Sequence, residues 1–316
     1  MAFDFIFTQS FFSTVLFQAL ALLPLLLYAS LGEIVAEKSG VVNLGIEGLM
    51  LMAAFSSFTF DYATKNPFAG VVGSLAVVAV MGLAFCFLTI TLKVDQIVAG
   101  LGMYLFGLGL SGVLYAIFTS GAGVGASGVP TVPKLEIPLL AQIPLIGPVL
   151  FEQNLLVYLS LILVPATSYL LSRTGLGLRV RAVGENPKAA DTMGISVARV
   201  RYAATMTGAI LAGVSGAYLA VGYTGSFQLG YTLGRGFIAL SMVYLSNWNP
   251  YRAFVAVFVY DFVDSLQSAV VINTPALAAS SYLLALLPYI FVLALIPIFG
   301  RKARAPKFLT IPYRKS

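Results

Sequence analysis

The side chains best suited to chemistry in this sequence are a few polar groups placed inside apolar runs. Asn43 and Glu47 stand at the start of a run that continues GLMLMAAF, while Asp261, Asp264 and Ser268 interrupt the run VYDFVDSLQSAVV. Carboxylates in such surroundings face a bundle interior or water, where they can bind a polar solute or brace a neighbouring helix. These five residues are therefore the first candidates for a polar site.

The residue inventory excludes most enzyme chemistry. The chain contains no histidine, and its only cysteine, Cys86, lies in the apolar run VVAVMGLAFCFLTITL. Imidazole relays, histidine-ligated metals and intrachain disulfides are impossible with this inventory. No GxxxxGK[ST] phosphate loop occurs either. We expect no catalytic residue, no metal site and no cofactor in this chain.

The elements that hold these polar groups must lie in a membrane. Hydrophobic residues make up 59% of the 316 residues and charged residues only 9%, with a mean hydropathy of +0.95, whereas soluble domains carry about 25% charged residues. The net charge of +6 is therefore expected in loops and gives no reason to expect nucleic acid. The composition predicts an all-α, polytopic protein of the cell (inner) membrane, one domain over residues 1–316, with about eight to ten spans.

Nine apolar segments are long enough, or nearly so, to cross a bilayer. The second and seventh are short, and the proline-rich segment 121–150 between the fourth and fifth predicts an extracytoplasmic loop with a short interfacial piece. The predicted spans are residues 10–31, 44–60, 68–92, 97–118, 154–172, 202–221, 234–247, 253–272 and 281–299.

Basic residues orient the chain. If the loop 173–201 and the tail 300–316 are cytoplasmic, alternation places fifteen of the 18 lysines and arginines inside. The N-terminus is then outside if nine segments cross. It is inside if the polar stretch 32–50 is a re-entrant element, and the sequence leaves both open.

The stretch around Asn43 and Glu47 predicts a helix break beside a watery cavity. The two residues are four apart and share a face if the segment is helical, while Gly40, Gly45 and Gly48 loosen the backbone. Irregular backbone at membrane depth is tolerated where it lines a cavity or is buried in protein. Glu47 either meets a solute or braces a neighbouring helix.

A second polar group forms one stripe on the eighth span. Asp261, Asp264, Ser265 and Ser268 follow i, i+3/i+4, i+7 spacing. We favour a stripe that lines a pathway; the alternative is an interhelical network that reaches Arg235.

Other groups are expected near water. Glu33, Glu37 and Lys38 follow the first span and are interpreted as surface charges. The outer loop contains three aromatics that either guard an entrance or belong to an interfacial belt: Tyr223, Phe227 and Tyr231.

Small residues predict how the spans pack. Gly208, Ala212 and Gly216 recur at i, i+4 and i+8, and Ala209, Gly213 and Ala217 repeat the pattern one position later. Such stripes let neighbouring helices approach closely.

The loop 173–201 contains a separately capped helix. Asn186 is a good N-cap, Pro187 suits the first helical position, and Gly194 supplies a left-handed stop after Met193. With glycine joints at Gly184 and Gly194, the short rigid helix is suited to dock into a pocket on a partner protein. The residues predicted to dock are Glu185, Asn186, Pro187, Lys188, Ala189, Ala190, Asp191 and Gly194.

Three separated blocks resemble one family. GENPKAADTMGI (184–195) is similar to the coupling loop of ABC importer permeases for branched-chain amino acids, ribose and nucleosides. GEIVAEKSGVVNLGIEGLMLMAAF (32–55) and GRGFIALSMVYLSNWNP (234–250) resemble two further blocks of that family. Lys188 departs from the acidic residue of the general E-A-A-x-x-x-G loop. The resemblance covers nearly the whole chain and is nearest the nucleoside and simple-sugar branch.

The resemblance implies a subunit without catalysis of its own. A cytoplasmic ATPase, a second identical or paralogous permease subunit and an extracytoplasmic binding protein or lipoprotein would complete the importer. Nucleoside is the expected substrate, simple sugar the alternative, and branched-chain amino acid a weaker one. Rival functions are an ion-coupled transporter using Glu47, Asp261 and Asp264, an intramembrane enzyme, and a scaffold.

Overall fold

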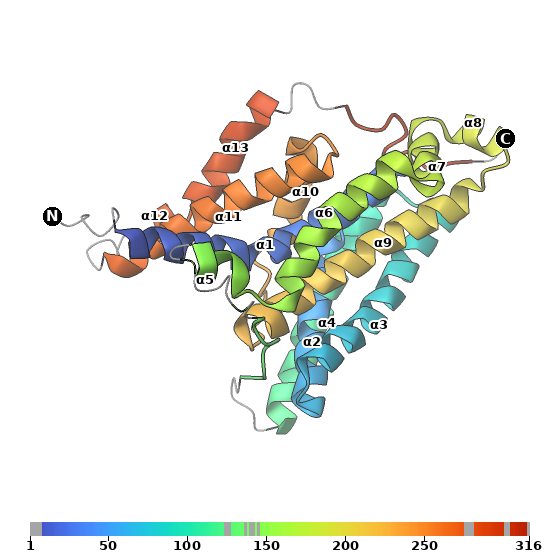
Figure 1. Ribbon diagram of the computed structural model, residues 1–316. Coiled ribbons are helices and arrows are strands. Elements are labelled where there is room, and N and C mark those ends of the chain that lie inside the picture. Colours follow the sequence, from blue (N-terminus) through green and yellow to red (C-terminus); the bar gives the residue numbers. More distant parts are fainter. Residues whose placement is uncertain are drawn as a thin grey trace.

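The computed structural model describes residues 8–122, 128–135, 138, 143, 146–274, 281–299 and 304–314. Its regular elements in these ranges are helices, arranged as a bundle (Figure 1). Within the described residues, six helical segments are long and apolar enough to span a membrane, and Arg235–Leu245 is a shorter apolar helix. In chain order the helices are α1 (Gln9–Lys38), α2 (Ile46–Thr64), α3 (Pro67–Cys86), η2 (Phe87–Thr91), α4 (Gln96–Ala122), α5 (Ile146–Phe151), α6 (Leu155–Arg173), α7 (Gly175–Glu185), α8 (Pro187–Thr192), α9 (Val197–Ala217), η3 (Tyr218–Thr224), α10 (Arg235–Leu245), α11 (Pro250–Asn273), α12 (Ser281–Leu284) and α13 (Leu287–Phe299).

Each predicted span contains a helix in the structure, but the helices begin and end at residues other than those predicted. The first continues to Lys38, well beyond Leu31, because it runs through the protein interior and not into water. The ninth is divided into α12 and α13. In the loop 121–150, residues 123–127 and most of 136–145 lie outside the described residues, and α5 is the short helix at its end.

Asparagine followed by proline begins three helices. Asn66, Asn186 and Asn249 each cap a helix with the side-chain oxygen, and proline takes the next position. The asparagine satisfies a free backbone N–H, and proline has no N–H to leave unpaired. The same two-residue signal therefore sets the starts of α3, α8 and α11.

The core of the bundle is α1, packed against α9. From Ala19 to Glu37 every residue of α1 is buried. The two small-residue stripes of α9 pack as predicted: Gly208 meets Gly32 of α1, and Gly216 meets the backbone of Met50 of α2. The other stripe faces α3, where Gly213 contacts Val78. Close backbone approach therefore holds three helices around α9.

The close packing of α1 on α9 can be tested by adding a methyl group at the contact. A Cβ added at Gly32 would lie 2.9 Å from Cβ of Leu211, whereas Gly102 of α4 has open space around it. Both substitutions by alanine gain helix propensity, but only Gly32→Ala crowds a neighbour, at a cost of about 1–3 kcal/mol. We expect the thermal midpoint of the purified protein to fall for Gly32→Ala and not for Gly102→Ala. Equal midpoints would contradict this packing.

The chain between α1 and α2 is non-helical inside the bundle. Residues 39–45 form turns and extended backbone, and Gly40 adopts a φ of +94°. Gln96 at the start of α4 accepts a hydrogen bond from Val42 N, 2.9 Å away, and Gly48 packs on Gly107 in the middle of α4. Helix α2 therefore begins in the protein interior. Of the break expected over residues 40–48, residues 40–45 are non-helical, whereas residues 46–48 already belong to α2.

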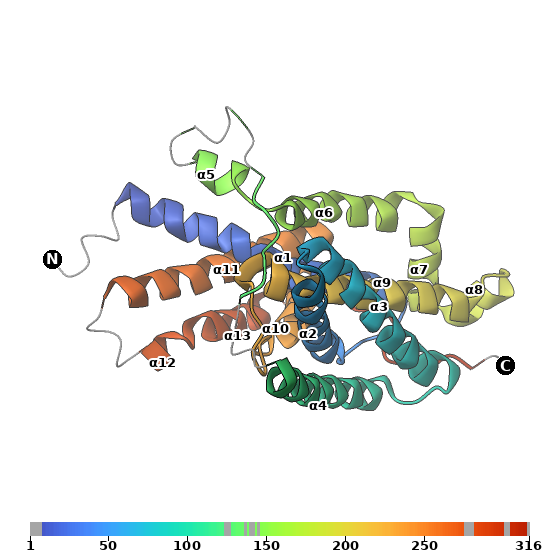
Figure 2. The same cartoon turned by 90° about the horizontal axis from the view of Figure 1, so that it is seen from below.

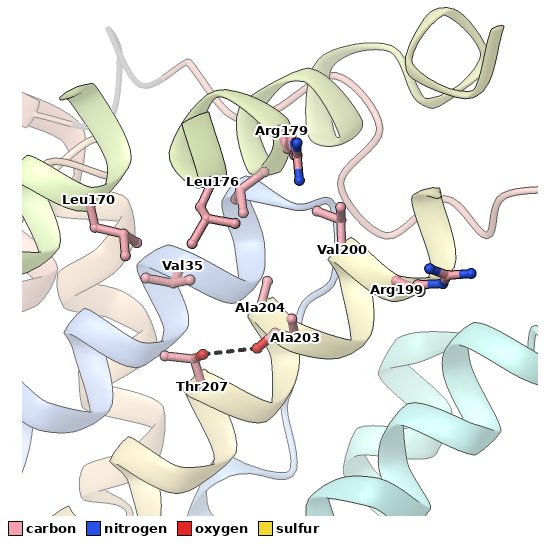
Figure 3. A pocket seen from close by; sticks show the side chains of 10 residues that line it. Val35, Leu170, Leu176, Arg179, Arg199, Val200, Ala203, Ala204 and Thr207 are labelled. Atoms are coloured by element: carbon pink, nitrogen blue, oxygen red, sulfur yellow. Dashed lines mark hydrogen bonds between the residues drawn. The ribbon is translucent and has the colours of Figure 1, made fainter. Parts of the chain in front are cut away.

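The segment between α6 and α9 contains two helices, not one. The predicted helix after Asn186 is α8, and Gly194 has the expected positive φ of +79°. Helix α7 precedes it and crosses the end of the bundle, transverse to α6 (Figure 2) and above α1 and α9 (Figure 3). Gly184 is not a joint, because it lies within α7, where a Cβ would meet the carbonyl oxygen of Lys38 at 2.2 Å.

The C-terminal tail lies at the same end as α7 and α8. Phe308 N donates to the carbonyl of Gly184 at 2.9 Å, and Arg201 Nη1 donates to the carbonyl of Ile311 at 3.0 Å. The start of α1 lies at the opposite end (Figure 1). This arrangement is the one expected if the N-terminus is outside while the loop 173–201 and the tail are cytoplasmic.

Candidate functional site

Glu47 caps the N-terminus of α10 in the interior of the protein. Its carboxylate accepts hydrogen bonds from Gly234 N at 2.8 Å, from Gly236 N at 2.6 Å and from the Thr232 hydroxyl at 2.5 Å. The side chain is 3% exposed. A carboxylate is favourable there because the first N–H groups of a helix lack intrahelical partners and carry partial positive charge. Glu47 therefore joins the start of α2 to the start of the short helix α10.

Two glycines allow the backbone of α10 to lie so close to Glu47. A Cβ at Gly236 would lie 2.8 Å from Cα of Glu47, so any other residue would push α10 away from the carboxylate. Gly234 has a positive φ of +78°, which L-residues with side chains rarely adopt. The GRG sequence at 234–236 is therefore required by the junction itself.

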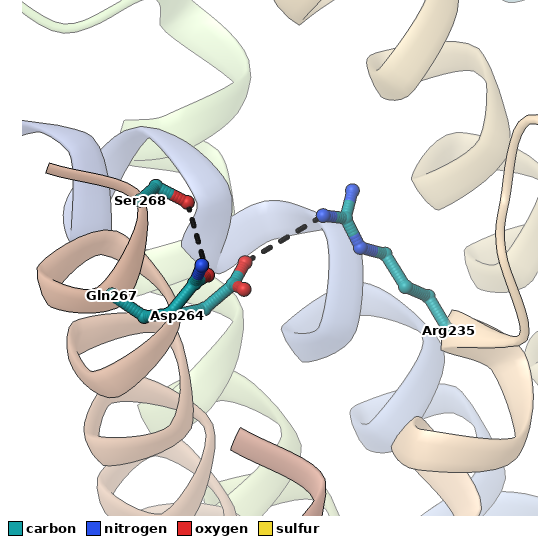
Figure 4. A network of polar contacts seen from close by, with 4 residues as sticks. All are labelled: Arg235, Asp264, Gln267 and Ser268. Atoms are coloured by element: carbon teal, nitrogen blue, oxygen red, sulfur yellow. Dashed lines mark hydrogen bonds and ion pairs between the residues drawn. The ribbon is translucent and has the colours of Figure 1, made fainter. Parts of the chain in front are cut away.

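The next residue of α10 ties the junction to α11. Arg235 Nη2 lies 3.7 Å from Asp264 Oδ2, with side-chain exposures of 21% and 24%, and Figure 4 shows the pair between the two helices. Asp264 thus makes the contact with Arg235 that the interhelical alternative expected, and both side chains remain partly exposed. Ser268 does not join this ion pair; its hydroxyl lies 3.5 Å from Gln267 Oε1 on the same helix.

The other half of the stripe is buried and incompletely satisfied. Asp261 is 3% exposed and Ser265 is 1% exposed. Asp261 Oδ2 and Ser265 Oγ have no hydrogen-bond partner among the described residues. Buried polar atoms are normally paired, so these two atoms are candidates to meet water or a polar solute.

Asn43 does not share a helical face with Glu47. Helix α2 begins only at Ile46, so the i, i+4 argument fails. Asn43 Oδ1 instead accepts from Gly45 N at 3.0 Å, and Asn43 N donates to Glu33 Oε1 at 2.7 Å. Asn43 therefore shapes the break and does not belong to the Glu47 junction.

Glu33 and Glu37 are not surface charges. Both are 0% exposed, and Lys38 is half-buried. Glu37 Oε2 accepts from Trp248 Nε1 at 2.6 Å, while Glu33 Oε2 and Glu37 Oε1 lack partners among the described residues. The interpretation failed because α1 does not end at the bundle surface: the break and residue 248 cover its last turns. One signal in the sequence that could have indicated a buried partner for Glu37 is the chain's single tryptophan, which lies in the block 234–250.

The outer aromatics have mainly a packing role. Phe227 is 1% exposed and contacts the rings of Phe55 and Tyr115. Tyr231 packs beside it, with ring centroids 6.1 Å apart. An entrance guard and an interfacial belt are both wrong for Phe227, because its ring is enclosed by α2, α4 and its own loop.

The arrangement is a polar junction inside the bundle. Helices α2 and α10 both begin there, the Glu47 carboxylate joins them, and a partly exposed ion pair lies beside two buried oxygens without partners among the described residues. Discontinuous helices whose ends face the midplane are a recurring device for binding and moving polar solutes. Nothing in this set is a nucleophile with an adjacent base.

The second candidate surface is the exposed face of α8. Asn186 Oδ1 accepts from Ala189 N at 3.1 Å, as the capping argument predicts. Pro187 and Ala190 are buried, and Ala190 belongs to a small cluster with Val183 and Val197. The residues left exposed are Glu185, Asn186, Lys188, Ala189, Thr192, Met193 and Gly194, with Asp191 half-buried. The helix therefore presents a free face on a firm base.

The C-terminal tail contacts α8 through a hydrogen bond. Tyr313 donates a hydrogen bond to Asp191 Oδ2 at 3.0 Å. Desolvation, followed by this hydrogen bond to the carboxylate, raises the pKa of Tyr313, so the phenol remains a neutral donor. At the other end of the tail, Arg304 N donates to Asn247 Oδ1 at 2.8 Å, next to the end of α10. The tail thus connects α8 with α10, and its pairing was absent from the sequence interpretation.

The ion pair between α10 and α11 can be measured by a double-mutant cycle. We expect Arg235→Gln and Asp264→Asn to couple by about 1 kcal/mol in unfolding free energy, at the lower end of the range for residues in contact. A matched cycle of Asp264→Asn with Lys65→Gln should be additive, because Lys65 lies at the end of α2 and stacks on Tyr62. Zero coupling for the first cycle would show that the pair does not hold the junction.

Residues 15–295 match the family described as the branched-chain amino acid transport system / permease component. A nucleoside ABC transporter permease protein from Lactococcus lactis subsp. cremoris is 33% identical over 299 residues, which cover 92% of this chain and 93% of that protein.

Two further relatives widen the set. A guanosine ABC transporter permease protein from Bacillus subtilis is 33% identical over 303 residues, covering 92% of this chain and 93% of its own. A putative glucose ABC transporter permease protein from Haloferax volcanii is 35% identical over 246 residues, covering 77% and 73% respectively. No solved structure matches the chain.

Proposed function

The chain belongs to the branched-chain amino acid transport system permease family, and on that basis we propose that it forms the membrane pathway of an ATP-driven importer for nucleosides. It is a multi-pass permease subunit of an ABC transporter. The proposal adds the substrate, the direction of transport and the partners of this particular chain.

The substrate assignment rests on how much of this chain each named relative aligns with. Two relatives whose names specify a nucleoside or guanosine align over 92% of the chain, whereas the relative named for glucose aligns over 77%. A simple sugar is the second candidate, supported by the 35% identity to the glucose-named relative.

The two described surfaces suit two partners. The family implies an ATPase and a substrate-binding protein. We place the ATPase, where ATP is hydrolysed, on the exposed face of α8, in the loop 173–201 on the cytoplasmic side. A second permease subunit, identical or paralogous, completes the pathway, and the binding protein delivers nucleoside to the opposite end.

Coupling passes through the tail and α10. Movement of α8 is transmitted through Tyr313 to the tail and through Asn247 to the end of α10. The other end of α10 carries the Glu47 junction and Arg235. A shift of α10 changes the surroundings of Asp261 and Asp264, which we assign to the pathway lining. In this mechanism Glu47 and Asn43 position the backbone and do not bind the solute.

Reconstitution tests the proposal as a whole. The permease, its ATPase and its binding protein are placed in proteoliposomes, and uptake of guanosine, ribose, glucose and leucine is measured with and without ATP. We expect ATP-dependent uptake of nucleoside. Uptake that follows an ion gradient without ATP would overturn the ATP-driven mechanism, and ATP-dependent uptake of sugar alone would overturn the substrate.

Calorimetry on the binding protein alone tests the identity of the substrate separately from the transport mechanism. The cognate binding protein is titrated with nucleosides, pentoses and amino acids in the absence of the permease. We expect heat of binding with nucleosides. Binding of pentoses only would replace nucleoside by sugar while leaving the role of the permease intact.

A further inference from the structure

An apolar groove opens at the end of the bundle that carries α7 and α8. Its volume is about 300 Å³, roughly ten times the ~30 Å³ share of one water molecule. Figure 3 shows its walls converging: Leu170 comes from α6, Leu176 from α7, Val35 from α1, and Ala203 and Ala204 from α9. The space suits a flexible aliphatic segment and is too small for a folded partner.

Below the two arginines at its mouth, the described residues that form the groove's walls are apolar except for Thr207. The hydroxyl of Thr207, at the inner end, already donates to the carbonyl of Ala203 at 2.9 Å. Water in such a groove would lack partners. An apolar occupant is therefore favoured over a polar one.

Two arginines give the rim a positive charge. Arg179 projects over the mouth from α7, and Arg199 extends outward from the start of α9 (Figure 3). Both side chains are exposed, and neither forms an ion pair within the described part of the chain. No acidic side chain is among the described residues that line the groove. The occupant's polar end is therefore expected to be anionic.

The surroundings place this rim at a membrane surface. The apolar walls belong to three helices long enough to span a bilayer, α1, α6 and α9, and the arginines lie at or beyond the ends of α6 and α9. Helix α7 crosses those ends and exposes Leu176 and Leu178 by 61% and 60%. Apolar side chains below, and basic ones at the level of the helix ends, match an acyl chain below its headgroup.

We propose that this groove binds an anionic phospholipid, with part of one acyl chain between α1, α6, α7 and α9 and the phosphate at the mouth, near Arg179 and in the positive field to which Arg199 adds. The lipid would sit between α7 and the spans, next to the joint with α8. The site is independent of which solute the protein transports, so its test does not depend on nucleoside uptake.

Lipid retention provides the test. The complex is purified from membranes, exchanged into detergent with phosphatidylglycerol or phosphatidylcholine, and analysed by native mass spectrometry. We expect preferential retention of phosphatidylglycerol by the unaltered protein. Arg179→Gln and Arg199→Gln should each weaken retention about fivefold, the effect of roughly one interfacial cation, while Arg181→Gln, on the same helix but outside the groove, should leave retention unchanged.

The groove itself is tested by filling it. Ala203→Trp should abolish retention of phosphatidylglycerol without changing the charge, and the two arginine variants keep the test valid if this protein does not fold. Soluble glycerol phosphate, added alone, should not compete at equal concentration. The proposal fails if the two lipids are retained equally, if glycerol phosphate competes fully, or if the variants lose a protein partner while lipid retention is unchanged.

Discussion

Glu47→Gln is expected to lower the thermal midpoint of the purified protein and to reduce uptake strongly. The side chain receives three donors, two from backbone N–H groups and one from a hydroxyl. An amide has only one acceptor oxygen, so its NH₂ group must face at least one backbone N–H. The substitution also removes the negative charge from the N-terminus of α10. Hydrogen bonds to charged groups contribute about 1.5–3 kcal/mol each, so the loss should amount to several kcal/mol.

Glu37→Gln is the matched control. Glu37 is also fully buried, but it receives one donor, Trp248 Nε1, and its other oxygen has no partner among the described residues. The glutamine carbonyl can keep that bond while the amide nitrogen takes the vacant position. We therefore expect a much smaller fall in midpoint for Glu37→Gln than for Glu47→Gln.

Kinetics distinguishes a brace from a ligand at Glu47. If the residue only holds α10, the surviving Glu47→Gln protein should show a lower maximal uptake rate with an unchanged KM. A raised KM with a normal midpoint and normal assembly would instead place Glu47 in contact with the solute. Unchanged uptake and stability together would remove it from the mechanism altogether.

Ala189→Arg is expected to weaken coupling to the ATPase strongly. Ala189 lies on the exposed face of α8, whose base is fixed by Pro187 and Ala190. A long cationic side chain there should prevent the short helix from seating in its partner. A loss of only about 1.4 kcal/mol in docking already weakens association tenfold, so we expect uptake and stimulated ATP hydrolysis to fall by roughly tenfold or more.

The control makes the same change at the opposite end of the bundle. Ala63 is an exposed alanine near the end of α2, and Ala63→Arg should leave ATPase association unchanged. Co-purification of the ATPase with each variant is the measurement. If Ala189→Arg retains the ATPase and normal uptake, α8 is not the docking element, and the transmission route through Tyr313 is lost with it.

The sequence was sufficient for those features whose signals are local. Asn186, Pro187 and Gly194 set the start and end of α8 through capping and a left-handed turn, both governed by neighbouring backbone groups. The small-residue stripes of α9 likewise needed only helical periodicity to be recognised as contact surfaces. Composition alone required a membrane, because too few polar residues exist to cover this chain in water.

The tertiary structure decided what the buried acids contact. Glu33 and Glu37 looked like surface charges because their neighbours in sequence are polar, yet residues 39–45 and 248 enclose them. Glu47 meets Gly234 and Gly236, almost 190 residues away in the chain. Periodicity gives no information about such pairings, since they depend on how whole helices pack.

The sequence by itself therefore determined the solvent, the helical segments, the small-residue contacts and the capped helix between α7 and α9. Each of these follows from interactions within about one helical turn or from the overall balance of apolar residues. Only the tertiary structure decided that Glu47 joins the starts of α2 and α10, that Arg235 pairs with Asp264, and that the tail links α8 to α10. Those contacts unite residues far apart in the chain, and close packing selects them.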